Sequence, residues 1–239
     1  MSYMMGNQCS PEEIRENIKR IRSRLGEAFI KSGRSPQEVR VMAVTKTVPA
    51  ELVNVAIQEG IDLLGENRVQ EFQSKRESYD LRKAEVHFIG HLQTNKVKYL
   101  ADTVTMIESV SSYKLAEEID RIMGKKQKKM PVLLEVNIGN EESKSGFEPN
   151  NLVENLEKLS KLSNISIKGL MCIPPKGESE KFFYNIQKLF VDIKGKKLDN
   201  IDMSVLSMGM SADFEQAIQY GSNIVRLGTV LFGHRNYQN

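Results

Sequence analysis

"VMAVTKTVPAELVNVAIQEGIDLLGENRVQEF", residues 41–72, holds two short apolar runs separated by a helical pattern. The first run, 41–45, is rich in β-branched residues, which favour an extended backbone, and Pro49 prevents the strand from continuing. Residues 50–60 then show helical spacing, and the second run covers 62–65. Strands joined through a helix pair in parallel, so this stretch predicts a parallel sheet with helical crossovers.

The alternation of strands and helices continues through the rest of the chain. We expect eight strands, at 41–45, 62–65, 86–90, 104–108, 132–137, 167–173, 204–208 and 224–228. Helical patterns lie between them, at 50–60, 67–79, 111–124, 151–162 and 179–193. Eight is the number of strands that closes a (β/α)₈ barrel, so a barrel is preferred to an open sheet.

An additional helix is expected before the first strand. Ser10 as N-cap, Pro11 at the first helical position and Glu13 in a capping box mark its start. The fold prediction is therefore an α/β protein: a single (β/α)₈ TIM-barrel domain over 1–239 with an N-terminal helix and a disordered leader at 1–9.

Composition excludes several classes of function. The chain has 34 basic and 31 acidic residues, a balance that gives no electrostatic case for nucleic acid or an anionic membrane. No run approaches the roughly 20 apolar residues of a membrane span, and the N-terminus lacks a signal-peptide pattern. Two cysteines without metal-ligand spacing predict reduced thiols and no metal site. We expect a cytoplasmic protein.

Polar residues follow several of the expected strands. In (β/α)₈ barrels the active site forms at the carboxyl ends of the strands. Lys46 follows the first strand, Asn67 the second and His91 the third. A lysine there has an ordinary alternative, because lysine is the commonest kind of surface residue and can extend into water from a strand end.

The last two strands end in loops that suit a phosphate. Glycines let backbone N–H groups approach an anion, and the loops after strands seven and eight are the recurrent phosphate site of barrel enzymes. Gly209 and Ser211 precede a helical pattern, and Gly228 and Thr229 directly follow strand eight. The alternative is that Ser211 only caps its helix and Gly228 only makes a turn.

Arg226 is a charged residue within an apolar strand. Strand alternation puts Ile224 and Arg226 on one face and Val225 and Leu227 on the other. If the two apolar residues pack against the helices, Arg226 points into the barrel, where a guanidinium needs a partner. A structural ion pair with Glu135 is one solution, and an acceptor on a bound ligand is the other.

At motif level the chain resembles a known family. The segments "AVTKTVP", "LLGENRVQEF", "HFIGHLQTNK", "SMGMSADFEQAI" and "VRLGTVLFG" are similar, in order and spacing, to those of the pyridoxal phosphate homeostasis proteins. The resemblance covers about residues 10 to 235. It implies the barrel of fold-type III pyridoxal 5'-phosphate (PLP) proteins, which is related to the N-terminal domain of alanine racemase.

The resemblance also implies roles for individual residues. Lys46 would carry PLP as a Schiff base, and Arg226 would face the pyridine nitrogen. The phosphate would be held by Ser211, Gly228 and Thr229. The cofactor would be bordered by Asn67 and His91, with an apolar wall formed by Ile89, Met171 and Met208. Simpler roles remain open for the last five: a helix cap for Asn67, a loop histidine for His91, and core packing for the apolar residues.

The implied function is PLP homeostasis without efficient turnover, with PLP-dependent apoenzymes as recipients. Arginine stays protonated, so its contact leaves the pyridine nitrogen unprotonated and the ring a weak electron sink. Alanine racemases carry a second, β-rich domain after the barrel, whereas about ten residues follow strand eight here, which also favours a monomer. The alternatives are a PLP-dependent, racemase-like enzyme of amino acids and a phosphate-binding barrel without PLP.

Overall fold

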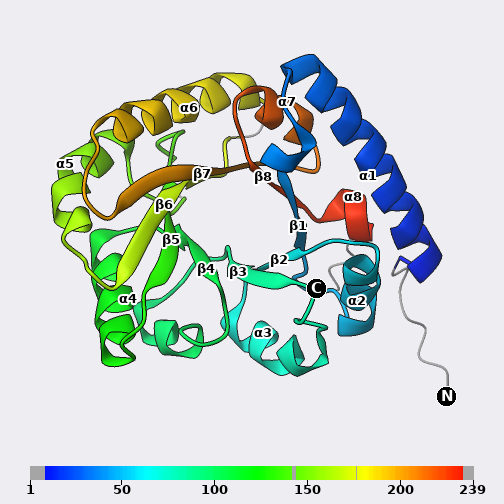
Figure 1. Cartoon of the computed structure of the whole chain (residues 1–239), viewed down its shortest axis with the longest axis horizontal. Coiled ribbons are helices and arrows are strands. Elements are labelled where there is room, and N and C mark those ends of the chain that lie inside the picture. The colour runs from blue at the N-terminus through cyan, green and yellow to red at the C-terminus, as the bar shows by residue number, and fades with distance from the viewer. Residues whose placement is uncertain (1–8, 142–143, 176, 234–239) are drawn as a thin grey trace.

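A computed structural model of the chain describes residues 9–141, 144–175 and 177–233 and shows a closed barrel of eight parallel strands in sequence order (Figure 1). Every strand pairs with its neighbours along the chain, and the eighth pairs with the first. The strands are β1 (Arg40–Val44), β2 (Leu63–Glu66), β3 (Glu85–Phe88), β4 (Met106–Val110), β5 (Met130–Val136), β6 (Ile165–Cys172), β7 (Ile201–Met210) and β8 (Ile224–Leu227). The predicted (β/α)₈ barrel is confirmed.

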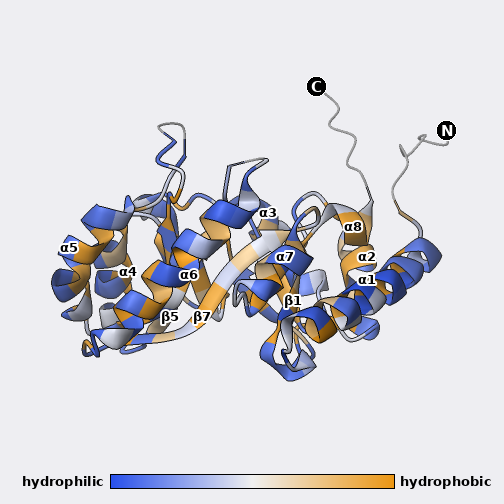
Figure 2. Cartoon of the chain, turned by 90° about the horizontal axis from the view of Figure 1, so that it is seen from above, coloured by the Kyte–Doolittle hydropathy of each residue, from blue (hydrophilic) through white to orange (hydrophobic). Residues whose placement is uncertain are grey.

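Helices surround the barrel. They are α1 (Pro11–Ser32), α2 (Ala50–Gln58), α3 (Val69–Lys75), α4 (Tyr113–Lys125), α5 (Pro149–Ser160), α6 (Ser179–Gly195), α7 (Phe214–Gln219) and α8 (Thr229–Phe232). Short 3₁₀ helices occur at η1 (Pro36–Glu38), η2 (Arg76–Ser78) and η3 (Thr94–Tyr99), and η3 alone connects β3 to β4. Figure 2 shows hydrophilic and hydrophobic residues alternating along the outer helices, as expected of helices with one buried face.

The additional N-terminal helix is confirmed as α1. The Ser10 side chain accepts from the Glu13 backbone N–H at 3.2 Å, and the Glu13 carboxylate accepts from the Ser10 N–H at 2.6 Å, so the capping box forms as predicted. The helix packs along α7, α8 and α2 (Figure 1). Of the expected leader, residues 1–8 lie outside the described residues, and Cys9 is half-buried.

Two apolar clusters hold the barrel. The large one fills the layer between strands and helices, and the small one lies inside the barrel and consists of Met42, Val44, Leu63, Ile89 and Ile224. Gly65 is required inside, because an added Cβ would lie 2.5 Å from the Met42 sulfur and 2.9 Å from Ile89 Cδ1. Only part of the interior is apolar, which leaves room for polar side chains from β3, β4, β7 and β8.

Two boundaries differ from the predicted ones in a way that matters for the site. The fourth strand was expected at 104–108 and is Met106–Val110, so Glu108 lies in the middle of β4 rather than at its end. The seventh was expected at 204–208 and is Ile201–Met210. Both strands have register shifts against a neighbour, and apolar periodicity alone does not reveal such irregularities.

None of the helices in the described part of the chain is long and apolar enough to cross a membrane. In the same residues no group of three or more His, Cys, Asp or Glu side chains is placed to hold a metal ion.

Gly169 in β6 offers a test of the barrel packing. Its φ is +152°, and an added Cβ would lie 1.7 Å from the carbonyl oxygen of Val205 in β7. We expect Gly169→Ala to lower the free energy of unfolding by at least about 2 kcal/mol, because it adds backbone strain and a clash. Urea denaturation measures this.

Gly26 is the matched control. It lies inside α1 with nothing within 4 Å of an added Cβ, so Gly26→Ala should raise the free energy of unfolding by roughly 0.5–1 kcal/mol. Equal effects of the two substitutions would contradict the packing described for β6 and β7.

Candidate functional site

The polar residues expected at strand ends gather at one mouth of the barrel. Lys46 is half-buried in the turn after β1, Asn67 directly follows β2, and His91 lies three residues after β3. Ser211 directly follows β7, and Thr229 begins α8 after β8. Because all eight strands are parallel, their carboxyl ends meet at the same mouth.

The turn that carries Lys46 is held by α3. Lys75 Nζ donates to two backbone carbonyls of this turn, at 3.1 and 3.2 Å, and pairs with the Glu71 carboxylate at 2.7 Å. The same carboxylate accepts from the backbone N–H of Thr47, whose φ of 62° is left-handed. Sequence analysis missed this support, although Glu71 and Lys75 have the spacing of a helical ion pair.

Glu66 lies buried behind that turn. Its Oε1 accepts from Thr45 Oγ1 at 2.7 Å and from the Tyr79 hydroxyl at 2.8 Å, and Lys75 Nζ is 3.9 Å away. Its Oε2 is buried without a hydrogen-bond partner in the structure. Burial raises the pKa of Glu66, and the nearby Lys75 ammonium opposes part of that rise. The sequence predicted no role for this carboxyl.

Asn67 and His91 border a pocket of about 620 Å³, with Arg68 and Lys96 also in its lining. The Asn67 side chain does not cap α3, whose N-cap is Arg68, and its Oδ1 is buried without a hydrogen-bond partner in the structure. Gly90 permits the close approach of the two loops, because an added Cβ would lie 2.0 Å from the Asn67 carbonyl oxygen. Asn67 therefore presents an acceptor that its own protein leaves unused, and His91 is exposed beside it.

The loops after β7 and β8 are joined through Ser211. Its Oγ accepts from the backbone N–H of Val230 in the first turn of α8, at 3.3 Å. Ser211 does not cap α7, which begins after Asp213. Gly209, the next-to-last residue of β7, has a φ of +89°, so the chain can turn tightly where this strand ends. The structure thus joins the two loops expected to bind phosphate.

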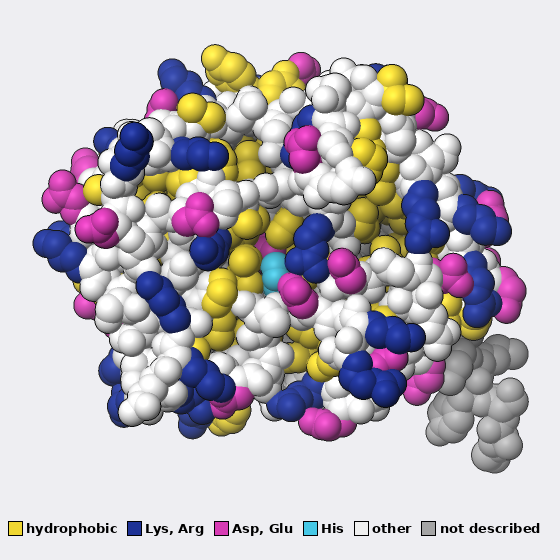
Figure 3. All heavy atoms as spheres, in the orientation of Figure 1, with side chains coloured by type: hydrophobic (Ala, Val, Ile, Leu, Met, Phe, Trp, Pro, Cys, Tyr) yellow, Lys and Arg dark blue, Asp and Glu magenta, His cyan; other side chains and the backbone are white. Residues whose placement is uncertain are grey.

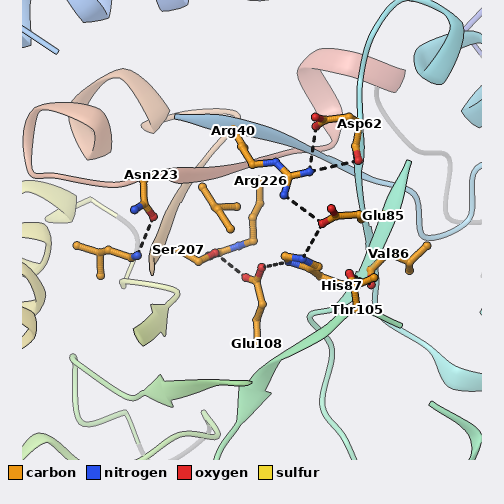
Figure 4. Close-up of polar contacts among 12 residues, drawn as sticks. Arg40, Asp62, Glu85, Val86, His87, Thr105, Glu108, Ser207, Asn223 and Arg226 are labelled. Carbon is orange, nitrogen blue, oxygen red and sulfur yellow. Dashed lines mark hydrogen bonds and ion pairs between the residues drawn. The ribbon is translucent and has the colours of Figure 1, made fainter. Parts of the chain in front are cut away.

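Arg226 points into the barrel, as strand alternation predicted. Its side chain is buried, and Nη1 donates to Ser207 Oγ at 2.7 Å (Figure 4). Nη2 donates to the Cys172 carbonyl at 2.8 Å. Among the described residues Arg226 forms no ion pair, so the alternative of a salt bridge to Glu135 is wrong. Two hydrogen bonds use only two of its five N–H donors.

The three residues expected as an apolar wall divide into two groups. Ile89 belongs to the apolar cluster inside the barrel, and Met171 is buried on β6 beside Ser207, whose side chain faces inward. Met208 differs from the expectation, because it follows Ser207 on β7 and packs in the layer between strands and helices. The candidate wall is therefore Ile89 and Met171.

Comparison with known proteins adds independent observations. The alanine racemase N-terminal domain family matches residues 10–236. A curated protein of Aquifex aeolicus, named pyridoxal phosphate homeostasis protein, is 42% identical over 226 residues, which cover 93% of this chain and 98% of the relative.

Solved structures agree with this comparison. PipY of Synechococcus elongatus PCC7942, solved with PLP bound, is 32% identical, with a TM-score of 0.80 over 92% of this chain and all of PipY (100%). Alanine racemase of Clostridium difficile 630 is 18% identical, with a TM-score of 0.73 over 95% of this chain and 57% of the racemase. The latter likeness concerns the fold alone.

Glu66 and Glu71 predict opposite pH dependences of stability. Because the pKa of Glu66 is raised in the folded protein, the protonated side chain stabilises the fold. This contribution is fully present below the unfolded pKa of about 4.3, and it is lost as the pH rises through the folded pKa. Relative to the unsubstituted protein, Glu66→Gln should therefore become steadily more stable as the pH rises from about 4 to about 8. Urea unfolding across this range measures the trend.

Glu71→Gln is the control, because hydrogen bonds from Lys75 and Thr47 outweigh burial and lower the pKa of Glu71. Its charged form stabilises the fold above the unfolded pKa, and that stability is lost as the pH falls. Glu71→Gln should thus be most destabilising near pH 7 and nearly neutral in acid. The same pH trend in both variants would contradict the assignment.

Proposed function

The chain belongs to the alanine racemase N-terminal domain family and, within it, to the pyridoxal phosphate homeostasis proteins, and from this membership we propose that it binds PLP at the carboxyl mouth of its barrel. The observation that carries the proposal is the buried guanidinium of Arg226, which has donors to spare and shares this mouth with Lys46. The relatives' names and the PLP-bound structure of PipY support the same conclusion.

The residues present fit this cofactor. Its pyridine nitrogen is an acceptor that suits an N–H of Arg226. The buried Oδ1 of Asn67 requires a donor, and the ring hydroxyl of a bound pyridoxal group would supply one. The start of α8, which the Val230–Ser211 hydrogen bond holds beside the loop after β7, suits a phosphate. Gly228 and Thr229 frame that corner, and Ile89 and Met171 provide the apolar wall.

When bound, PLP supplies an aldehyde that an amine attacks reversibly and a ring that withdraws electrons. In this chain Lys46 is the proposed point of covalent attachment, held by the turn that Lys75 and Glu71 fix. His91 borders the opening of the site. These residues bind and orient the cofactor, and the pocket beside them remains open to solvent.

We propose storage and delivery of PLP rather than efficient turnover. An arginine at the ring nitrogen does not give up its proton, so the ring remains a weak electron sink. The curated relative that aligns over 98% of its own length is named a homeostasis protein, which supports this reading over the racemase-like alternative. Delivery to PLP-dependent apoenzymes belongs to the proposal, and the monomeric state and cytoplasmic location stay predictions.

Covalent capture tests the site. We expect borohydride treatment of the protein with PLP to add one reduced pyridoxyl phosphate group, located by peptide mapping at Lys46, since reduction makes the reversible bond permanent. Lys46→Ala should lose this label, whereas the exposed Lys98→Ala should keep it. A label that maps elsewhere in the unsubstituted protein would contradict the role of Lys46.

Exchange of the α-proton of amino acids tests turnover. With the protein and PLP in heavy water, we expect alanine and other small amino acids to exchange no faster than with PLP alone, because Arg226 does not favour carbanion formation. Proton NMR of the α-hydrogen measures the rate. Rapid exchange that disappears in Lys46→Ala would instead establish a racemase-like enzyme.

A further inference from the structure

A line of buried polar contacts crosses the inside of the barrel, from Arg226 toward the mouth formed by the amino-terminal ends of the strands (Figure 4). Ser207 Oγ accepts from Arg226 at 2.7 Å and donates to Glu108 Oε2 at 2.6 Å. The other carboxylate oxygen of Glu108 lies 2.6 Å from His87 Nδ1. We name these four residues, Arg226, Ser207, Glu108 and His87, the interior relay.

The charges of Arg226 and Glu108 determine how the Ser207 hydroxyl between them is oriented. A guanidinium can only donate and a carboxylate can only accept, so the single hydroxyl proton of Ser207 must point to Glu108 and its lone pairs to Arg226. Nη1 of Arg226 is thereby held, and the Cys172 carbonyl holds Nη2. The guanidinium is fixed at two points, and its remaining N–H groups are left for another acceptor.

Glu108 is the residue on which this arrangement depends. It is fully buried in the middle of β4, and both of its oxygens have hydrogen-bond partners, one on β3 and one on β7. Burying a carboxylate costs several kcal/mol unless hydrogen bonds or an opposite charge compensate. The interior positions of Met42, Leu63 and Ile224 show that this barrel packs apolar side chains inside, so packing alone does not require an acid.

His87 anchors the far end of the relay. It lines a hollow of about 350 Å³ at the amino-terminal mouth, together with Arg40 and Glu85. Figure 3 shows this hollow, with a histidine inside it and acidic and basic side chains at its edge. Arg40 pairs with Glu85 at 3.1 Å, and the His87 side chain is only 3% exposed. His87 lies between this hollow and the Glu108 side chain, which is 0% exposed.

We propose that Glu108 is a positioning residue for the cofactor: through Ser207 it orients the guanidinium of Arg226 toward the pyridine nitrogen of PLP. This inference rests on the proposed function and deepens it. Without the interior relay Arg226 remains in the barrel, but its guanidinium is no longer held at Nη1 and can rotate. Part of the energy of the hydrogen bond between the guanidinium and the ring nitrogen is then lost.

The test compares PLP with 1-deaza-PLP, in which a C–H group replaces the ring nitrogen. In the unsubstituted protein we expect the analogue to bind about tenfold more weakly, because it leaves a buried N–H of Arg226 unpaired. In Ser207→Ala and Glu108→Gln this ratio of affinities should fall toward one. A purely structural role would weaken both ligands equally and leave the ratio unchanged.

Ser222→Ala is the matched control. Ser222 is buried near the same strands, and its hydroxyl contacts only backbone carbonyls of β7 and β8, so the ratio should stay about tenfold. Thermal melting reports whether each variant is folded. If Glu108→Gln does not fold, Ser207→Ala decides the matter, since it removes a single hydroxyl oxygen.

The possible results separate the two proposals. PLP binding with an unchanged ratio in Ser207→Ala and Glu108→Gln would overturn the role of Glu108 and leave the proposed function intact. No PLP binding by the unsubstituted protein would overturn both.

Discussion

The pairing of β1 with β8 closes the barrel, and the site depends on it. Arg40 lies opposite Ile224, and Met42 lies opposite Arg226, so residues 184 positions apart in sequence become neighbours. The turn after β1 carries Lys46, and the loop after β8 carries Gly228 and Thr229. An open sheet of the same strands would leave these groups at opposite edges, where neither could complete a shared site.

The barrel interior has two halves with different physical roles. Apolar side chains from β1, β2 and β8 fill one part and supply packing energy. The interior relay fills the other part with charges whose hydrogen bonds hold particular orientations. Such buried polar groups add little net stability, since desolvation offsets most of their attraction. Their contribution is to fix the orientation of the side chains. A ligand that contacts the guanidinium at a particular angle requires such a fixed orientation.

Much of the fold follows from periodicity, because each strand is a compact apolar run between turn residues. Arg226 could be placed inside the barrel from its own strand, since Val225 and Leu227 on the other face are apolar. Glu108 could not, because the predicted strand ended at that residue and the real one continues for two more. Met208 was expected beside the cofactor only through the family resemblance, and its position directly after the inward-facing Ser207 on β7 places it instead in the layer between strands and helices. The support of Lys46 by Lys75 requires knowledge of how α3 packs, which local sequence does not contain.

The side-chain amide of Asn17 in α1 donates to the Leu231 carbonyl in α8 at 3.1 Å, and Val230 in the same short helix donates to Ser211. The first helix of the barrel therefore braces the corner proposed for phosphate, although it contributes nothing to the site itself. During synthesis on the ribosome, Lys46 emerges long before α8 does. A nascent chain consequently cannot hold the cofactor in its final geometry until nearly the whole barrel has been translated.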